Sequence, residues 1–388
     1  MSDAPNSRPS VRVGLVGTSW WAEAMYLPAL ADHSIGTITA LCGRDLERAK
    51  TVAASWQVTH VYDDWSTMLA GGEIDAVIIA TPNETHYEIT MAALERGFPV
   101  LCEKPLGMSV AEANEMAGAA EHSNAITMVP FTYRFMPTNQ FIKQLIVDGY
   151  VGQPYHLSMR YFAGYARDGA YAWRFDEAKA GTGILGDLGS HWLDMARWFL
   201  GEVTAVSAHR DSFVPREPRP DGSSYTQVED SAVILARFES GASATLQVSA
   251  VCWEGTPFGQ IHELDLHGSG GTLHAVNDWD TVQEVRGLRA GEPGPAHVLP
   301  IPDEAWRGAP RERVHDTYRH IFRRTEAMTR QWVTAIAEGQ QVQPDFAVGA
   351  RVQELVAAAI TSAATDGSWQ AVPNRSGLNG IGSVGARA

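Results

Sequence analysis

The first third of this 388-residue chain alternates two kinds of segment. Short apolar runs rich in β-branched residues predict strands, and the stretches between them have the periodicity of helices. Strands that alternate with helices predict an α/β fold in which helices cover both faces of a doubly wound parallel sheet. The predicted strands are residues 11–16, 38–42, 76–80, 99–102 and 125–131, and the predicted helices are residues 20–32, 45–55, 64–70, 84–96 and 109–122.

The pattern changes after about residue 130. A helix near 137–148 and a strand near 154–163 come first. Between 202 and 300 the predicted strands are 203–208, 231–238, 242–251 and 261–267, and helical segments follow at 311–339 and 345–364. Sequential strands predict a second α/β domain with a mostly antiparallel, open sheet. An open sheet has an edge and a face to cover, so we expect a homodimer or homotetramer. The predicted division is a flexible N-terminus at 1–10, a first domain at 11–130, a second domain at 131–365 and a tail at 366–388.

The composition excludes several classes of partner. A formal net charge of -15 argues against binding to nucleic acid or to an anionic membrane surface. Cys42, Cys102 and Cys252 lie too far apart for a disulfide framework or a zinc cluster, which fits a reducing compartment. The sequence shows no signal peptide and no run of membrane-spanning length, so we expect a cytoplasmic protein.

One set of acidic and histidine side chains has the alternation of a strand. Glu263, Asp265 and His267 would share one face of it. This set resembles metal ligands, but we favour an exposed or interface-facing sheet surface and expect no metal site.

A glycine turn follows the first predicted strand. The residues Gly17-x-Ser19-x-x-Ala22 form a dinucleotide-binding turn in which Ser19 replaces the second glycine. The helix that follows can bind a pyrophosphate at its N-terminus. Trp20 and Trp21 lie inside this turn and are further candidates for cofactor contacts.

The end of the second predicted strand bears on the type of cofactor. An NAD site usually has an acidic residue there, which binds the ribose hydroxyls. Here Gly43 takes that place and Arg44 follows it. A guanidinium can pair with the 2′-phosphate of NADP(H), so we favour NADP(H) over NAD(H). The alternative is that Arg44 is a solvated residue at the start of a helix.

Polar residues also follow the later strands of the first domain. Ligands bind at the carboxyl ends of the strands in such sheets. Lys104 would place a positive charge at the inner edge of the cleft. The candidate cofactor contacts at these ends are Thr81, Pro82, Asn83, His86, Glu103 and Lys104.

The segment 185–199 combines an acidic residue with a histidine. On a helix, Asp187, His191 and Asp194 would share one face, and an apolar stripe would lie beside them. A carboxylate held near an imidazole suits proton transfer to or from a substrate hydroxyl. The alternative is a satisfied core histidine. Once Asp187 and His191 are assigned to the substrate, Asp194 fits a structural carboxylate better than a third catalytic group.

These motifs together resemble the glucose–fructose oxidoreductase, inositol dehydrogenase and rhizopine-catabolism (Gfo/Idh/MocA) oxidoreductase family. The resemblance spans roughly residues 11–200. The second glycine of the dinucleotide turn is its main departure. The matching pieces are Gly17-x-Ser19-x-x-Ala22, Ala80-Thr-Pro-Asn83-x-x-His86, Glu103-Lys104-Pro105, Tyr133-Arg134-Phe, Trp173-Arg174 and the run from Ala180 to Asp194.

The resemblance implies an NAD(P)-dependent oxidoreductase that acts on a sugar, an anhydrosugar or a polyol. It implies an N-terminal Rossmann domain, a C-terminal domain for substrate binding and oligomerisation, and a catalytic trio of Lys104, Asp187 and His191. Either Lys104 or His191 would carry the proton. The candidate substrate contacts are Lys104, Tyr133, Arg134, Arg160, Tyr161, Trp173, Arg174, Asp187 and His191. Tyr165 is a further polar residue that could bind a substrate hydroxyl.

Two other functions remain open. One is a redox-neutral glycoside hydrolase, in which a retained cofactor oxidises and re-reduces the same sugar. The other is a non-catalytic NADP-binding regulator. The presence of both Lys104 and His191 argues against a regulator.

Overall fold

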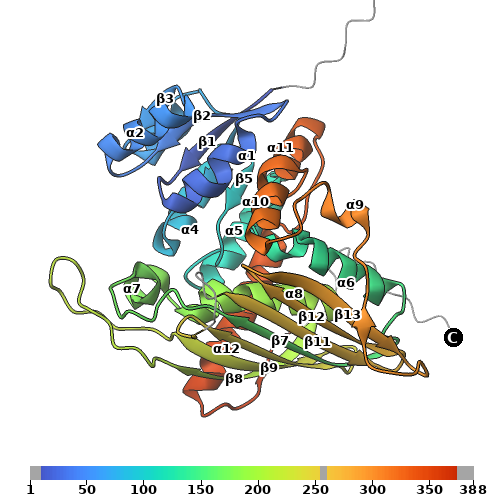
Figure 1. Cartoon of the computed structure of the whole chain (residues 1–388). Coiled ribbons are helices and arrows are strands. Elements are labelled where there is room, and N and C mark those ends of the chain that lie inside the picture. The colour runs from blue at the N-terminus through green and yellow to red at the C-terminus, as the bar shows by residue number, and fades with distance from the viewer. Residues whose placement is uncertain (1–9, 254–259, 374–388) are drawn as a thin grey trace, which may run out of the picture. The chain divides into compact units, whose positions relative to one another are not determined.

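The computed structural model describes residues 10–253 and 260–373, which form two compact units (Figure 1). The first unit comprises the chain up to Pro130 together with Arg319–Ala350. The second comprises Phe131–Tyr318 and the chain from Arg351 onward. The predicted flexible N-terminus, apart from Ser10, and the predicted tail from residue 374 onward lie outside the described residues.

The first unit is built on a six-stranded parallel sheet with the order β3-β2-β1-β4-β5-β6. This order confirms the predicted doubly wound α/β fold. The sequence did not predict β3, because three half-buried residues carry no alternation to detect. The strands are β1 (Val11–Val16), β2 (Gly36–Cys42), β3 (His60–Tyr62), β4 (Ala76–Ile79), β5 (Val100–Cys102) and β6 (Thr127–Met128).

Helices connect the strands of the first unit. They are η1 (Ala22–Tyr26), α1 (Leu27–Leu30), α2 (Leu46–Trp56), α3 (Trp65–Ala70), η2 (Asn83–Thr85), α4 (His86–Glu95) and α5 (Val110–Ser123). Helix α5 begins as its sequence predicts, because the Ser109 hydroxyl accepts the backbone N–H of Glu112 at 3.2 Å.

Residues 319–350 join the first unit although they follow the second unit's strands in the chain. The Trp332 indole donates to the backbone carbonyl of Ile126, and Arg323 donates to that of Ala24. The predicted helix 311–339 is interrupted, because Met328 has a positive φ of 51°. The helices of this stretch are α10 (Val314–Arg324), α11 (Thr329–Glu338) and α12 (Phe346–Ala364), and α10 and α12 contribute residues to both units.

The second unit contains a nine-stranded sheet with the order β14-β13-β12-β11-β7-β10-β9-β8-β15. Neighbouring strands are antiparallel except for β7 and β10, so the predicted mostly antiparallel sheet is confirmed. The strands are β7 (Pro154–Phe162), β8 (Val203–Asp211), β9 (Ser231–Phe238), β10 (Ser243–Ser249), β11 (Ile261–Gly268), β12 (Gly271–Asp278), β13 (Val282–Arg289), β14 (His297–Val298) and β15 (Gln370–Ala371).

The two faces of this sheet differ. Helix α8 (Ser190–Leu200) packs on one face, over β7 and β10, as Figure 1 shows. On β7, Met159 and Tyr161 point into that packed face, whereas Ser158 and Arg160 point to the other, more exposed face. We call the second face the open face. The remaining elements are η3 (Thr132–Phe135), α6 (Pro137–Val147), η4 (Trp173–Phe175), α7 (Glu177–Ala180), η5 (Leu185–Gly189) and α9 (Asp303–Trp306).

Candidate active site

The turn after β1 has the geometry that a dinucleotide site needs. Gly17 has a φ of 123°, and a Cβ at this position would overlap the backbone carbonyl oxygen of Ala80. Its own N–H donates to the carbonyl of Cys42 at 2.9 Å. The position therefore requires glycine, and the chain enters the following helix close to the sheet.

Ser19 lies just before the next helix, which begins at Trp20. The Ser19 hydroxyl accepts the backbone N–H of Ala22 at 3.3 Å, so the serine that replaces the second glycine supports the beginning of the helix. The first turn, η1, is π-helical. Wide turns of this kind are frequent at functional sites. Trp20 is exposed, whereas the Trp21 indole donates to a Glu103 carboxylate oxygen at 2.6 Å.

The end of β2 leaves no room for an acidic side chain. A Cβ on Gly43 would lie 2.6 Å from the methyl carbon of Thr18. Asp45 is occupied as the cap of α2, where its carboxylate accepts the backbone N–H of Arg48. The Arg44 side chain is exposed beside this corner. A cation, rather than a carboxylate, therefore follows β2.

The structure corrects the prediction that His86 contacts the cofactor. His86 has no exposed surface, and its ring nitrogens lie 3.0 Å from the carbonyl oxygens of Thr81 and Pro105. Glu103 also has protein partners, because it accepts the Trp21 indole and the Tyr26 hydroxyl. His86 therefore joins the loops at the ends of β4 and β5, whereas Glu103 joins the end of β5 to the helix that follows β1.

The other candidates at these strand ends have intermediate or low exposure. Thr81, Pro82 and Lys104 are half-buried, and Asn83 is buried at the start of η2. Lys104 is the second residue after β5 and belongs to the first unit, whereas Asp187 and His191 belong to the second.

In the second unit, Asp187 is held by two side chains. Its carboxylate accepts the Tyr165 hydroxyl at 2.7 Å and lies 3.3 Å from Nε of Arg174. The Arg174 guanidinium stacks on Trp173, 4.6 Å from the ring centre. Trp173, Arg174 and Asp187 therefore lie together. Tyr165, the further polar candidate, belongs to the same cluster.

His191 is buried beside aromatic rings. Its ring centre lies 4.7 Å from that of Tyr133 and 5.9 Å from that of Phe131. Only 6% of His191 is exposed. Asp187 lies on the π-helical turn η5 and His191 on α8, so the regular α-helix expected for the whole segment is wrong. The segment still places a packed histidine, His191, four residues after the fixed carboxylate of Asp187.

Three of the predicted substrate contacts have other partners. Tyr133 and Tyr161 are buried and share a hydrogen bond of 2.8 Å between their hydroxyls. Arg160 lies on the open face and pairs with Glu263 at 2.7 Å. Because neighbouring strand residues point to opposite faces, Arg160 and Tyr161 cannot serve the same site. We therefore remove Arg160 from the predicted substrate contacts.

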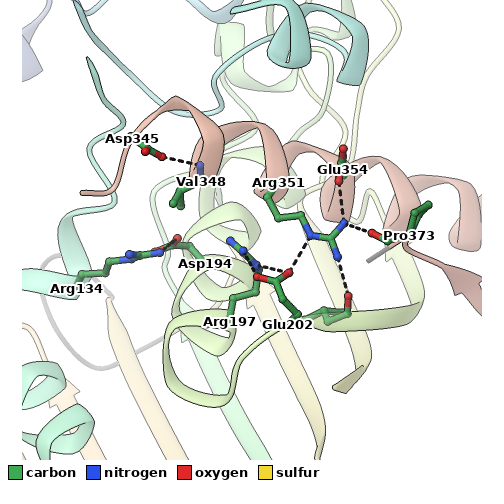
Figure 2. A network of polar contacts seen from close by, with 10 residues as sticks. Arg134, Asp194, Arg197, Glu202, Asp345, Val348, Arg351, Glu354 and Pro373 are labelled. Atoms are coloured by element: carbon green, nitrogen blue, oxygen red, sulfur yellow. Dashed lines mark hydrogen bonds and ion pairs between the residues drawn. The ribbon is translucent and has the colours of Figure 1, made fainter. Parts of the chain in front are cut away.

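Arg134 is likewise committed to a structural role (Figure 2). Its Nε and Nη2 donate to the two Asp194 oxygens at 2.7 and 2.5 Å. Asp194 has no exposed surface, which agrees with its predicted structural role. Figure 2 also shows Glu202 between Arg197 and Arg351, a second buried charge group of this unit. The predicted substrate contact at Arg134 is thus corrected to an ion pair that anchors α8.

The acidic and histidine residues of β11 have partners on neighbouring strands. Glu263 pairs with Arg160, and Asp265 pairs with His274. In the part of the chain that the structure describes, no three His, Cys, Asp or Glu side chains are arranged to hold a metal ion.

Within the same residues, no helix is both long and apolar enough to cross a membrane.

Two separate segments of the chain match the profiles of the two domains of one family. The profile of the oxidoreductase family with an NAD-binding Rossmann fold matches residues 11–131. The profile of the GFO/IDH/MocA C-terminal domain matches residues 139–274. The chain belongs to the GFO/IDH/MocA oxidoreductase family. The predicted family and the predicted enzyme class, an oxidoreductase with a nicotinamide cofactor, are thereby confirmed.

Relatives extend this match over almost the whole chain. The levoglucosan dehydrogenase of Pseudarthrobacter phenanthrenivorans is 30% identical, over 94% of this chain and 98% of its own. A crystal structure of an oxidoreductase domain protein from Kribbella flavida is 31% identical, with a TM-score of 0.82 over 94% of this chain and all of that one. A levoglucosan dehydrogenase structure in complex with NADH and levoglucosan is 26% identical, with a TM-score of 0.83 over the same shares.

One residue that organises the site escaped the sequence analysis. Glu229 is buried, and its Oε1 accepts the backbone N–H groups of Gly183 and Leu185 at 2.9 and 3.1 Å. Its Oε2 accepts Arg210 at 2.8 Å. A carboxylate thus satisfies N–H groups at the start of the helix that carries Asp187. No local pattern reveals this role, because 44 and 46 residues separate the partners.

Glu229→Gln should lower the free energy of unfolding by about 1–3 kcal/mol, because an amide cannot accept on both sides of this buried position. A urea titration followed by circular dichroism measures the change. Glu47→Gln is the matched control, because the Glu47 side chain is 83% exposed. The Glu47→Gln control should change the free energy of unfolding by less than about 0.5 kcal/mol. Equal midpoints for the two variants would contradict the assigned role.

Proposed function

We propose that this protein is an NADP(H)-dependent oxidoreductase that transfers hydride between the nicotinamide and a hydroxyl-bearing carbon of a sugar, an anhydrosugar or a polyol. The observation that carries the proposal is the Asp187 carboxylate held by Tyr165 and Arg174, one turn before a packed His191. The chain that carries this pair also has a dinucleotide turn. The name of its relative, levoglucosan dehydrogenase, supports an anhydrosugar or a related compound.

The residues of the first unit fit a dinucleotide. The glycine conformation at Gly17 and the helix start at Ser19 leave backbone N–H groups near the turn for a pyrophosphate. When bound, the nicotinamide would accept or supply the hydride at its C4 atom. In this proposal Trp20, Thr81 and Asn83 flank the cofactor, and Lys104 is shared between cofactor and substrate.

We propose that Lys104, Asp187 and His191 are the catalytic residues. Lys104 would donate a hydrogen bond to the reacting oxygen and stabilise the alkoxide charge that develops as the hydroxyl loses its proton. His191 or Lys104 would take the hydroxyl proton. Asp187 would accept a second substrate hydroxyl, and Trp173 would offer a flat surface to sugar C–H groups.

The preference for NADP(H) rests on the corner after β2. Gly43 cannot be extended without moving Thr18, and Arg44 is exposed at the same corner, where we propose that it pairs with the 2′-phosphate. Arg44→Ala should lower kcat/KM with NADP by about 10- to 100-fold, because a hydrogen bond to a charged group contributes about 1.5–3 kcal/mol. It should leave kcat/KM with NAD nearly unchanged. Steady-state rates with each cofactor measure both values, and faster turnover of the wild type with NAD would contradict the assignment.

The open face of the second unit is the proposed surface for self-association. Its residues are half-exposed along β7, β11 and β12, which fits a sheet face covered by a second copy. We accordingly propose a homodimer or homotetramer. Cys42 and Cys102 are buried free thiols, which fits the proposed cytoplasmic location.

A substrate screen tests the proposed function. Purified protein is mixed with NADP or NAD and a panel of monosaccharides, anhydrosugars and inositols, and the absorbance of reduced nicotinamide is followed. We expect reduction with at least one member of the panel. Failure with every member and both cofactors would contradict the proposal. Cleavage of a glycoside without net reduction would instead identify the redox-neutral hydrolase.

A further inference from the structure

His86 is a histidine of the first unit that the proposed chemistry does not use. It is the first residue of α4 and has no exposed surface. Its Nδ1 lies 3.0 Å from the Pro105 carbonyl oxygen, and its Nε2 lies 3.0 Å from the Thr81 carbonyl oxygen. A side chain enclosed in this way cannot touch substrate or cofactor. It can act only through the two loops that it joins.

The two loops are the ones that carry the candidate site residues of this unit. Thr81 follows β4, and Pro105 directly follows Lys104 at the end of β5. A bond to the Pro105 carbonyl therefore fixes the Pro105–Leu106 peptide unit, one residue beyond Lys104. Displacements of about 1 Å at a reacting group can lower a rate by about 100-fold, so a group that fixes this loop affects turnover.

A neutral imidazole can donate to only one of the two carbonyls, because it carries one N–H. Burial lowers the pKa of His86, and the hydrogen bonds to the two carbonyls oppose this effect. At neutral pH the ring is therefore neutral, and the two contacts are not equivalent. One nitrogen donates, and the other faces a carbonyl oxygen with its lone pair.

We propose that His86 is the positioning residue of Lys104, and that it acts by donating its Nδ1–H to the Pro105 carbonyl. The role of Lys104 rests on the proposed function, but the hydrogen bond does not. His86 was predicted to contact the cofactor. It instead contacts the backbone of the loop that follows β5. The Nε2 contact with Thr81 is secondary and sets the distance between the two loops.

Two isosteric variants separate the two nitrogens. Asparagine places its amide N–H₂ near the position of Nδ1, and glutamine places its amide N–H₂ near that of Nε2. His86→Asn should retain kcat within about threefold of the wild type, whereas His86→Gln should lower kcat by about 10- to 100-fold. KM for the cofactor should change little in either. His122→Asn and His122→Gln are the matched controls, because His122 is exposed on α5 of the same unit.

Equal losses of kcat in the two His86 variants, or a loss confined to His86→Asn, would overturn the proposal. A loss that merely follows the urea midpoint would also overturn it, because that result describes a structural residue. The comparisons of kcat need an active enzyme. Two NMR measurements test the same proposal without one.

The nitrogen spectrum of the wild type reports the tautomer directly. Long-range ¹H–¹⁵N correlations, with His86 identified by its loss in either variant, should show a protonated Nδ1. An N–H on Nε2 alone would overturn the proposal even if a variant fails to fold.

The lysine spectrum reports Lys104 itself. The chain has only four lysines, Lys50, Lys104, Lys143 and Lys179, so ¹³C-methylated protein gives a simple spectrum. The Lys104 signal, identified by Lys104→Arg, should shift in His86→Gln and stay near its wild-type position in His86→Asn. An unchanged signal in His86→Gln would contradict the role. A wild type that reduces no cofactor while these spectra behave as expected would remove the proposed function and leave the hydrogen bond in place.

Discussion

Lys104→Ala should lower kcat for oxidation of the sugar by about 10²- to 10⁴-fold. The variant loses the donor to the reacting oxygen and the charge that stabilises the alkoxide. Cofactor binding should change only a few-fold, because the glycine turn and the helix start do not involve this side chain. The two effects are measured by initial rates at saturating cofactor and by quenching of protein fluorescence on cofactor binding.

Lys50→Ala is the matched control for this variant. Lys50 belongs to the same unit and forms an exposed i,i+3 pair with Glu47. Exposed pairs contribute about 0–1 kcal/mol to stability, so this variant should fold and turn over like the wild type. Full activity of Lys104→Ala would remove Lys104 from the mechanism. If Lys104→Ala lost cofactor binding to the same extent as kcat, Lys104 would be a residue of the cofactor site alone.

Arg134→Met should lower the free energy of unfolding by about 3–5 kcal/mol, because it leaves the Asp194 carboxylate buried and unpaired. Arg134 forms two hydrogen bonds with Asp194, and Asp194 has no exposed surface. The double variant Arg134→Met/Asp194→Leu should recover much of the loss, because no charge is then buried. Urea titrations of the three proteins measure the differences.

Arg12→Met provides the comparison for this pair. Arg12 forms a similar two-pronged contact with Asp75, but the two side chains are 44% and 39% exposed. Its loss should cost about 1 kcal/mol or less. If Arg134→Met were as stable as Arg12→Met and instead raised KM for the sugar, Arg134 would be a substrate contact after all.

Periodicity in the sequence was sufficient for most of the fold. Strand β1 has the predicted bounds, β9 spans Ser231–Phe238 as predicted, and α12 begins one residue after its predicted start. Strand β12 was not predicted, because its half-exposed polar residues and its Gly271 start resemble a turn. The grouping of residues 319–350 with the first sheet depends on packing between distant segments, which local patterns do not contain.

The candidate site was predictable where a motif is local. Asp187 and His191 come from one short continuous segment, and Gly17 and Ser19 come from one turn. Arg160 was an avoidable error, since Tyr161 follows it on the same strand and must face the other way. Tyr165 and Glu229 act over 22 to 46 residues of sequence, and only the fold brings them to their partners.

The central claim is transfer of hydride from a carbon of the sugar to the nicotinamide. The most direct measurement uses a substrate from the panel that carries deuterium at its carbon-bound positions, with mass spectrometry of the reduced cofactor. We expect one deuterium in the nicotinamide for each sugar oxidised, in the wild type and, more slowly, in Lys104→Ala. A sugar that is consumed while no deuterated cofactor accumulates would contradict it.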